Sequence, residues 1–171
     1  MREVPIVQLG LGGVGRALIE QVITAEATGI PERRWRVHPR WIAVADSHGF
    51  LYRRRGLSSA ILREVLDLKC QGESLESING FTPGSADALL NEVMDRTDVP
   101  GIVVDVTAAM NMEGALLKAV EREWGVVLAN KRPLTGSYEV FARLKGSGRL
   151  RHEATVGAGL PVISTVDYLL D

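Results

Sequence analysis

The feature that most constrains the fold is a glycine-rich hexapeptide, GLGGVG, at residues 10–15. It follows an apolar run, VPIVQL at residues 4–9, and opens a segment in which apolar residues recur at helical spacing. A strand, a glycine-rich turn and a helix in this order are the context in which G-x-G-x-x-G predicts dinucleotide binding. A plain glycine-rich turn is the simpler alternative, and the surrounding pattern favours the binding function.

Each motif glycine has an expected role in such a site. Gly10 permits the tight turn out of the strand, Gly12 lets the backbone approach a pyrophosphate, and Gly15 lets the helix pack against the strand. The free N–H groups and the dipole at the helix N-terminus, where Val14 also lies, favour the phosphate charge. The helix is expected to pack on the sheet through one apolar face. That face comprises Val14, Ala17, Leu18, Val22 and Ala25.

Length and charge narrow the class of protein. A chain of 171 residues suffices for about one domain with a sizeable core. The net charge of −1 gives no indication of binding to nucleic acid or to an anionic membrane. No apolar run approaches the ~18 residues of a membrane helix, and no signal peptide fits the N-terminus. The single cysteine, Cys70, excludes an internal disulfide and fits a reducing compartment, so we expect a cytoplasmic protein.

The remaining pattern alternates short apolar runs with segments of helical period. This alternation predicts an α/β fold, a Rossmann-like, doubly wound and mostly parallel sheet with helices on both faces. Residues 72–80 carry no clear pattern. Further strands are expected at 41–46, 102–107, 126–129 and 150–155, and further helices at 58–68, 85–94, 111–120, 138–145 and 161–170.

Asp46 closes the second expected strand, 31 positions after Gly15. In a Rossmann unit, an acid at this point accepts hydrogen bonds from the ribose hydroxyls of the nucleotide. The alternative is an Asp that only begins a turn at residues 46–49. A carboxylate here would repel the 2′-phosphate of NADP and weakly favour NAD, whereas the RRR run at residues 53–55 could pair with that phosphate or form a solvated turn.

Three stretches together resemble the homoserine dehydrogenases. They are GLGGVG at residues 10–15, ANKRPL at residues 129–134 and EATVGAGLP at residues 153–161. Many dinucleotide-binding proteins share the first, the second is moderately specific and the third is highly specific, and their order matches the family. The resemblance covers essentially the whole chain but only the N-terminal half of the family's catalytic unit.

This resemblance implies oxidation of L-homoserine to L-aspartate 4-semialdehyde, or the reverse, with NAD or NADP. The reaction belongs to the biosynthesis of threonine and methionine, with a small-molecule substrate and a homodimer as the full-length form. It places Lys131 beside the nicotinamide and the substrate as the catalytic residue, and Thr107 against the cofactor. From the residues alone, Lys131 stands out because Pro133 stiffens its loop at the carboxyl end of a strand.

The third stretch implies a monovalent cation, Na⁺, held largely by carbonyl oxygens. The residues implicated are Glu153, Val156, Ala158 and Leu160. From the sequence alone, the glycines in this stretch would let carbonyls point at a hard cation, but a strand that ends in a turn would look the same. The expected domain boundary lies here: residues 1–150 form the NAD(P)-binding domain, and residues 151–171 begin a catalytic and dimerisation domain.

The rest of that second domain is expected beyond Asp171, and the 171 residues alone are expected to be inactive. Two other functions stay open at this point. One is a non-catalytic module that senses NAD(P) or docks on a partner. The other is a different Rossmann dehydrogenase acting on an amino acid or a semialdehyde, although Cys70 is badly placed for the catalytic cysteine of a semialdehyde dehydrogenase.

Overall fold

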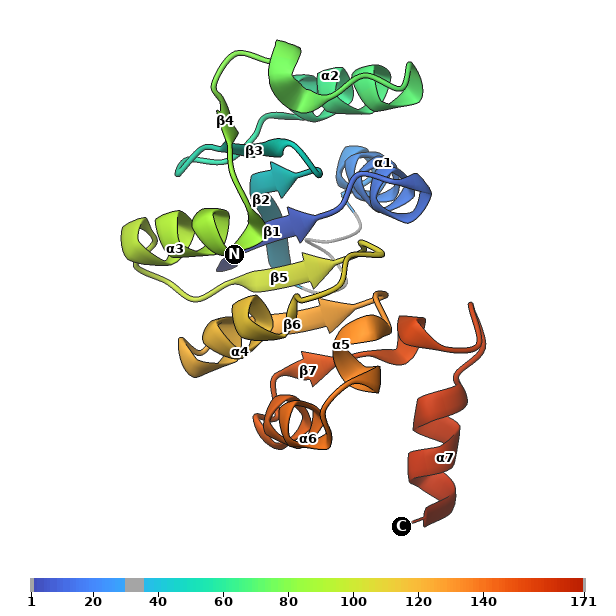
Figure 1. Ribbon diagram of the computed structural model, residues 1–171. Coiled ribbons are helices and arrows are strands. Elements are labelled where there is room, and N and C mark those ends of the chain that lie inside the picture. The colour runs from blue at the N-terminus through green and yellow to red at the C-terminus, as the bar shows by residue number, and fades with distance from the viewer. Residues whose placement is uncertain (1, 30–35, 171) are drawn as a thin grey trace.

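The computed structural model describes residues 2–29 and 36–170, and these fold around one twisted sheet (Figure 1). In the described part the sheet has seven strands in the order β4-β3-β2-β1-β5-β6-β7. The strands are β1 (Arg2–Leu9), β2 (Val37–Ala45), β3 (Gly49–Tyr52), β4 (Phe81–Pro83), β5 (Ile102–Asp105), β6 (Gly125–Leu128) and β7 (Leu150–Arg151).

The strand order places a crevice at the carboxyl ends of the central strands. β1 pairs in parallel with β2 on one side and with β5 on the other, and β5, β6 and β7 continue in parallel. The chain therefore leaves β1 in one direction and later returns to its other side. In open α/β sheets, ligands bind at such a reversal, outside the carboxyl ends of the strands.

Helices cover both faces of the sheet, as the sequence predicted (Figure 1). On one face, α1 (Gly13–Ala27) and α2 (Ser59–Cys70) bury Ile19, Ile23, Leu62 and Val65. On the other face lie α3 (Ala86–Arg96), α4 (Glu113–Glu121) and α6 (Tyr138–Gly146). Two hydrophobic cores thus sandwich the sheet, and the expected Rossmann-like α/β fold is confirmed.

The buried face of α1 differs from the expectation. Val14 is 61% exposed, and the buried positions are Gly15, Ile19 and Ile23. Because the first turn must bring Gly15 against the strand, the helix is rotated so that its neighbour Val14 points to solvent. Leu18 and Val22, which were expected to pack, do lie against the core as partly buried residues.

A β-hairpin that the sequence pattern did not predict follows the second strand. Asp46 begins a tight turn, because its amide donates to the carbonyl of Gly49 (3.0 Å) and its carboxylate accepts from the amides of His48 and Gly49 (2.9 and 3.3 Å). The turn returns the chain as β3, antiparallel to β2, with Ala45 opposite Phe50. β4 then adds a second antiparallel strand directly after residues 72–80, which carried no clear pattern.

Two predicted helix starts are confirmed by their caps. The hydroxyl of Ser58 accepts from the amide of Ile61, and that of Ser85 accepts from the amide of Ala88 (3.3 Å each). Such side chains satisfy amides that have no partner within the helix. The helix expected from Asn111 begins instead at Glu113, and residues 132–135 of the expected loop form a one-turn helix, α5 (Arg132–Thr135).

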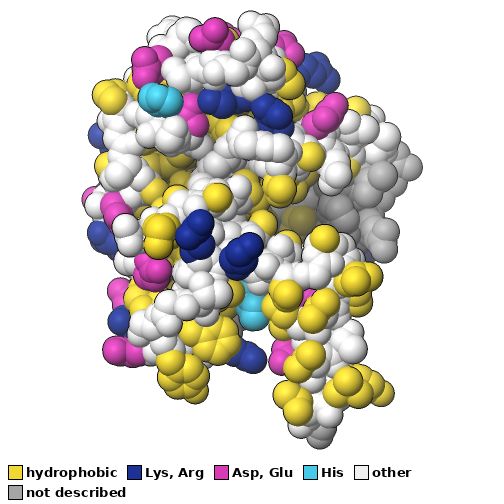
Figure 2. All heavy atoms as spheres, turned by 45° about the vertical axis from the view of Figure 1, so that its right-hand side comes forward, with side chains coloured by type: hydrophobic (Ala, Val, Ile, Leu, Met, Phe, Trp, Pro, Cys, Tyr) yellow, Lys and Arg dark blue, Asp and Glu magenta, His cyan; other side chains and the backbone are white. Residues whose placement is uncertain are grey.

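The C-terminal segment departs from the sheet. The strand expected to reach residue 155 ends at Arg151, and η3 (Glu153–Thr155) follows as a single 3₁₀ turn. The last helix, α7 (Val162–Leu170), extends away from the sheet (Figure 1). Figure 2 shows hydrophobic side chains gathered over it. Val166, Tyr168, Leu169 and Leu170 are exposed, and no residue of α7 is buried.

Candidate functional site

A cavity of about 710 Å³ opens at the carboxyl ends of β1, β2 and β5. This is the point at which the strand order reverses, so the cavity occupies the crevice that the topology creates. The segments that form it come from five separate parts of the chain. Its lining includes Gly10, Gly12, Arg16, Asp46, Lys69 and Thr107.

The three motif glycines meet different surroundings. Gly10 has a φ of +102°, and a Cβ there would lie 3.0 Å from both the amide nitrogen and Cγ2 of Thr107. A Cβ on Gly15 would lie 2.2 Å from the carbonyl oxygen of Gly10, so this position requires glycine for the helix to approach the strand. A Cβ on Gly12 would meet no atom within 4 Å, because this position faces open space.

The N-terminus of α1 is free to bind an anion. Gly12 is the N-cap residue and supplies no side-chain hydrogen bond to the first turn. The first amides of a helix have no partner within it, and together with the helix dipole they favour a negative charge. At Gly12, therefore, the helix end has no side-chain cap, and the space next to it is open and could hold an anionic group.

The side chain of Gln8 anchors the glycine loop, although no pattern in the sequence predicted a function for this residue. Its side chain is fully buried in β1 and donates to the carbonyl oxygens of Gly10 and Gly15, at 3.0 Å each. Its own oxygen accepts from the indole N–H of Trp41 (3.0 Å). A polar residue inside an otherwise apolar strand was the available signal, since buried amides require partners.

Asp46 lies at the cavity, but its carboxylate is already occupied. Besides the turn amides on Oδ1, its Oδ2 accepts from Lys69 Nζ (3.1 Å) and from the amide of Leu75 (3.2 Å). Burial by itself raises the pKa of this carboxyl, but the hydrogen bond from His48, together with Lys69 and Leu75, outweighs burial and holds the pKa below its ordinary value. Asp46 is thus an ionised turn residue paired with a lysine.

The cations near Asp46 are not the expected arginines. Arg53 donates to the carbonyl of Asn79 (2.8 Å), and Arg54 pairs with Asp98 (2.7 Å), so both side chains are engaged outside the cavity lining. Arg16 and Lys69 line the cavity instead, and Arg16 Nη1 donates to the carbonyl of Lys69 (2.7 Å). Only the packing of α1 against α2 brings these two side chains together.

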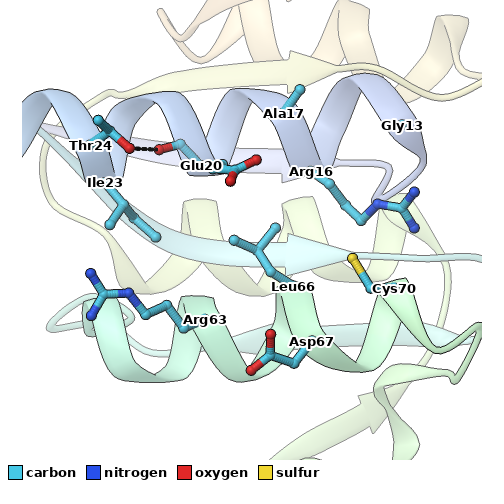
Figure 3. Close-up of a pocket in the computed structure, with 10 residues that line it drawn as sticks. All are labelled: Gly13, Arg16, Ala17, Glu20, Ile23, Thr24, Arg63, Leu66, Asp67 and Cys70. Atoms are coloured by element: carbon cyan, nitrogen blue, oxygen red, sulfur yellow. Dashed lines mark hydrogen bonds between the residues drawn. The ribbon is translucent and has the colours of Figure 1, made fainter.

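Arg16 also borders a second, open cavity of about 500 Å³ between α1 and α2 (Figure 3). Leu66 points into this groove from α2, and the charged residues along it are of both signs: Arg16, Glu20, Arg63 and Asp67. Cys70 stands at its end as an exposed thiol. The groove presents no single charge and no buried polar group, in contrast to the glycine-lined cavity.

Thr107 lines the cavity and belongs to a buried hydrogen-bond network. Its amide and its hydroxyl donate to Oδ1 of Asp105, at 2.9 and 2.7 Å. The side-chain amide of Asn130 donates to Asp105 Oδ2 (3.1 Å), to Thr107 Oγ1 (3.2 Å) and to the carbonyl of Ala109 (3.0 Å). Asp105 and Asn130 were not among the expected site residues, although both stand at strand ends.

Lys131 follows Asn130 directly, at the N-cap of α5. Its side chain is exposed, and within the described residues its ammonium has no hydrogen bond or ion pair. It does not line the cavity of 710 Å³, and neither does Val14. The structure therefore brings together Gly10, Gly12, Asp46 and Thr107, while Lys131 stands on the neighbouring loop.

The residues expected at a cation site lie in η3 and in the loop between η3 and α7. The Glu153 side chain caps α7, accepting from the amides of Ile163 and Ser164 (3.1 Å each), so its carboxylate is engaged. The carbonyl of Leu160 accepts from the amide of Val162 (2.9 Å), and Ala158 has a φ of +52°. The described residues contain no group of three or more His, Cys, Asp or Glu side chains that could hold a metal ion.

His152 lies beside this segment and borders a small cavity with Lys145 and Asp167. Burial lowers the pKa of His152, and Lys145 lowers it further, whereas Asp167 and Glu153 oppose the shift. Lys145 and Asp167 lie 3.6 Å apart and link α6 to α7.

The helices among the described residues are too short or too polar to span a membrane.

Comparison with known proteins gives a consistent result. No protein-family model matches the chain. It is 29% identical to the bifunctional aspartokinase/homoserine dehydrogenase of Haemophilus influenzae over 167 residues, which are 95% of this chain and 19% of that protein. It is 35% identical to the homoserine dehydrogenase of Schizosaccharomyces pombe over 91 residues, which are 50% of this chain and 24% of that protein.

A solved structure of a hyperthermophilic archaeal homoserine dehydrogenase in complex with NADPH superimposes with a TM-score of 0.75 at 27% identity. The superposition covers 96% of this chain and 48% of the archaeal chain. The chain thus spans about half the length of this solved relative, and its matches cover less than a quarter of the two curated relatives named above. In sequence and in fold, the chain is similar to part of these homoserine dehydrogenases.

Proposed function

We propose that the chain is the NAD(P)-binding domain of a homoserine dehydrogenase and that the glycine-lined cavity holds the dinucleotide. The observation that carries this proposal is the position of Gly12. It stands at an uncapped helix N-terminus, and the space beyond it is open at the carboxyl edge of the sheet. A pyrophosphate needs both features, namely unpaired amides and room for the phosphate oxygens.

The cavity offers separate places for the two halves of the cofactor. The pyrophosphate would lie against residues 10–12 and the N-terminus of α1. In a Rossmann unit the adenosine ribose lies at the end of the second strand, here beside Asp46 and Lys69. The nicotinamide half would then extend across the reversal point towards Thr107 and Ala109, which form the opposite wall.

The charges at the adenosine end support NADP as the preferred cofactor. The sequence weakly favoured NAD because a carboxylate at Asp46 would repel a 2′-phosphate. In the structure, Lys69 neutralises that carboxylate, and Arg16 lies on the same wall of the cavity. A phosphate would therefore meet two cations and one already paired carboxylate, which favours its binding. The archaeal relative was solved with NADPH.

The proposed reaction is hydride transfer between the carbon bearing the hydroxyl of L-homoserine and the nicotinamide, which gives L-aspartate 4-semialdehyde. The nicotinamide supplies the hydride chemistry when bound, and the protein orients the reactants and moves the hydroxyl proton. Lys131 is the proposed catalytic cation, since its ammonium is free within the described residues and its loop adjoins the Thr107 wall. The pathway would be threonine and methionine biosynthesis.

We further propose that residues 151–171 begin a second domain that supplies the substrate site and the dimer interface. The weak attachment of α7 and its exposed apolar side chains support this boundary. A monovalent cation bound by the carbonyls of Glu153, Val156, Ala158 and Leu160 stays a proposal. At Leu160, the carbonyl oxygen would have to bind the cation while it also accepts the hydrogen bond from the amide of Val162. The cytoplasmic location also stays a prediction.

Calorimetric titration of the chain with NADPH and with NADH tests the binding proposal. We expect saturable binding of both, with NADPH the tighter ligand and with loss of binding in the Gly12→Val variant. Failure of the folded wild-type chain to bind either dinucleotide would overturn the assignment. Homoserine-dependent reduction of NADP by a protein that includes the following domain would then separate a dehydrogenase from a non-catalytic NAD(P) sensor.

A further inference from the structure

The buried pair Asp105 and Asn130 links the end of β5 to the loop that follows β6. Asp105 ends β5 and is fully buried, and Asn130 follows β6 and is 3% exposed. Within the described chain no Lys or Arg forms an ion pair with Asp105. Its carboxylate is satisfied by Thr107, through the amide and the hydroxyl, and by the side-chain amide of Asn130.

The side chain of Asn130 forms hydrogen bonds with the loops that follow β5 and β6. Its nitrogen reaches Asp105, Thr107 and the carbonyl of Ala109, and its oxygen accepts from the amide of Arg132 (3.1 Å). One side chain therefore contacts the loop after β5 and the loop after β6 at the same time. Each contact fixes a position on a loop that the strand ladders themselves leave free.

A role in packing alone does not account for this choice of residues. Buried polar groups cost free energy unless every partner is supplied, and an apolar pair would fill the same space without that requirement. The network instead fixes the position of the Thr107 wall relative to the glycine loop. Thr107 is held where its amide and methyl would lie 3.0 Å from a Cβ on Gly10, so the wall and the glycine loop are fixed against each other.

We infer that Asp105 and Asn130 are positioning residues for the nicotinamide half of the cofactor, an inference that rests on the proposed function. They hold the Thr107–Ala109 wall at the far side of the reversal point, and they fix the backbone on which Lys131 stands. The adenosine end of the cavity depends on other contacts, chiefly Asp46 with Lys69 and the turn at residues 46–49. The two ends should therefore respond separately to substitution.

The test compares two ligands in one set of variants of the full 171-residue chain. NADPH reports on the whole cavity, and 2′,5′-ADP reports on the adenosine half alone. For Asn130→Ala we expect at least a tenfold weaker affinity for NADPH, loss of the NADPH fluorescence enhancement on binding, and less than a threefold change for 2′,5′-ADP. Asn91→Ala, in α3 and hydrogen-bonded to Lys118, is the matched control and should change neither.

Complementary substitution keeps the test decisive if Asn130→Ala does not fold. Asn130→Asp should place two acceptors across the 3.1 Å contact and impair NADPH binding. Adding Asp105→Asn restores a donor opposite an acceptor at this one contact, although not the bond to the Ala109 carbonyl, so the double variant should recover part of the loss, at least threefold in NADPH affinity over Asn130→Asp. Independent damage at the two positions would instead accumulate.

The outcomes separate the inference from the proposed function. If the wild-type chain binds neither NADPH nor 2′,5′-ADP, the proposed function fails. If the wild type binds both, and Asn130→Ala weakens the two ligands equally or leaves both unchanged, the positioning role is wrong. Absence of any recovery in the double variant would overturn it as well, because the contact between the two side chains would then be irrelevant to the cavity.

Discussion

Lys69 Nζ lies 3.1 Å from Oδ2 of Asp46, and this contact joins the C-terminal end of α2 to the turn after β2 at the edge of the cavity. Both side chains are largely buried, with 17% and 7% of their surfaces exposed. The pair turns the acid expected to bind a ribose into the partner of a cation. In the proposed function, this pairing is the reason for a preference for NADPH over NADH.

Lys69→Met should therefore shift cofactor preference. Removal of the ammonium leaves the Asp46 carboxylate facing the site of the 2′-phosphate, so NADPH should bind at least tenfold more weakly, equivalent to about 1.4 kcal/mol. NADH carries no such phosphate and should change less than threefold. Titration calorimetry measures both values, and Lys145→Met, on the distant α6, provides the control. Equal losses for NADPH and NADH would contradict the proposed role of Lys69.

Gly12 and Gly15 should separate binding from folding. Gly12→Val places its side chain in open space, so the free energy of unfolding should fall by less than about 1 kcal/mol, the cost of a poor N-cap residue. Dinucleotide binding should be lost, since the side chain fills the place of the pyrophosphate. Gly15→Ala puts one methyl group 2.2 Å from the Gly10 carbonyl and should destabilise the fold by about 1–3 kcal/mol or more. Thermal denaturation and calorimetry test the pair.

Stability should decrease in acid through Asp46. Its pKa is lower in the folded chain than in the unfolded chain, so the unfolded state binds a proton first as the pH falls. The stabilisation is present above the unfolded pKa of about 3.9 and is lost as the pH falls through the folded pKa. Asp46→Asn should cost about 1–3 kcal/mol at pH 7, because it removes hydrogen bonds to a charged group.

The same variant should show a shallower loss of stability below pH 4 in urea titrations at a series of pH values. Asp87→Asn, in the first turn of α3, is the control for removing a carboxylate elsewhere. A variant with the same acid dependence as the wild type would show that Asp46 titrates normally.

Helix α7 should mediate self-association of the chain. Leu169 is 74% exposed and Leu170 is 81% exposed, and burial of each such side chain is worth about 1.5–3 kcal/mol. Leu169→Glu should therefore weaken association at least tenfold without lowering the unfolding temperature, whereas Glu139→Gln, on α6, should leave it unchanged. Light scattering across a concentration series measures the effect. A wild-type chain that stays monomeric at all concentrations would refute this prediction.

The 171 residues alone should not oxidise homoserine at a measurable rate. Correct positioning of the substrate against the nicotinamide lowers the activation barrier by about 7–11 kcal/mol. Within the described chain, no side chain pairs with Lys131 to form a site that would bind an amino-acid substrate. In a protein extended through the following domain, Lys131→Ala should lower kcat by about 10²–10⁴-fold and change the Kd for NADPH by less than threefold. Turnover by the chain alone would place the proton relay within these residues.

The local pattern of the sequence determined the elements and their order. Apolar runs alternating with helical periods predicted most strands and helices, because these signals act within a few residues. The glycine turn at Gly12 and the helix that follows it were predicted for the same reason. The motif also predicted the edge of the sheet on which a ligand would lie.

Only the tertiary structure decided how charges are paired at that edge. Asp46 and Lys69 are 23 residues apart in sequence, and Asp105 and Asn130 are 25 apart. Their contacts exist because parallel strands and packed helices bring distant segments together. The hairpin at β3 was missed because Asp46 fits a strand end and a turn equally well in sequence, and its carboxylate selects the turn through hydrogen bonds to backbone amides. Local propensity fixes where an element begins, whereas the partners of a buried polar group depend on packing that no short window contains.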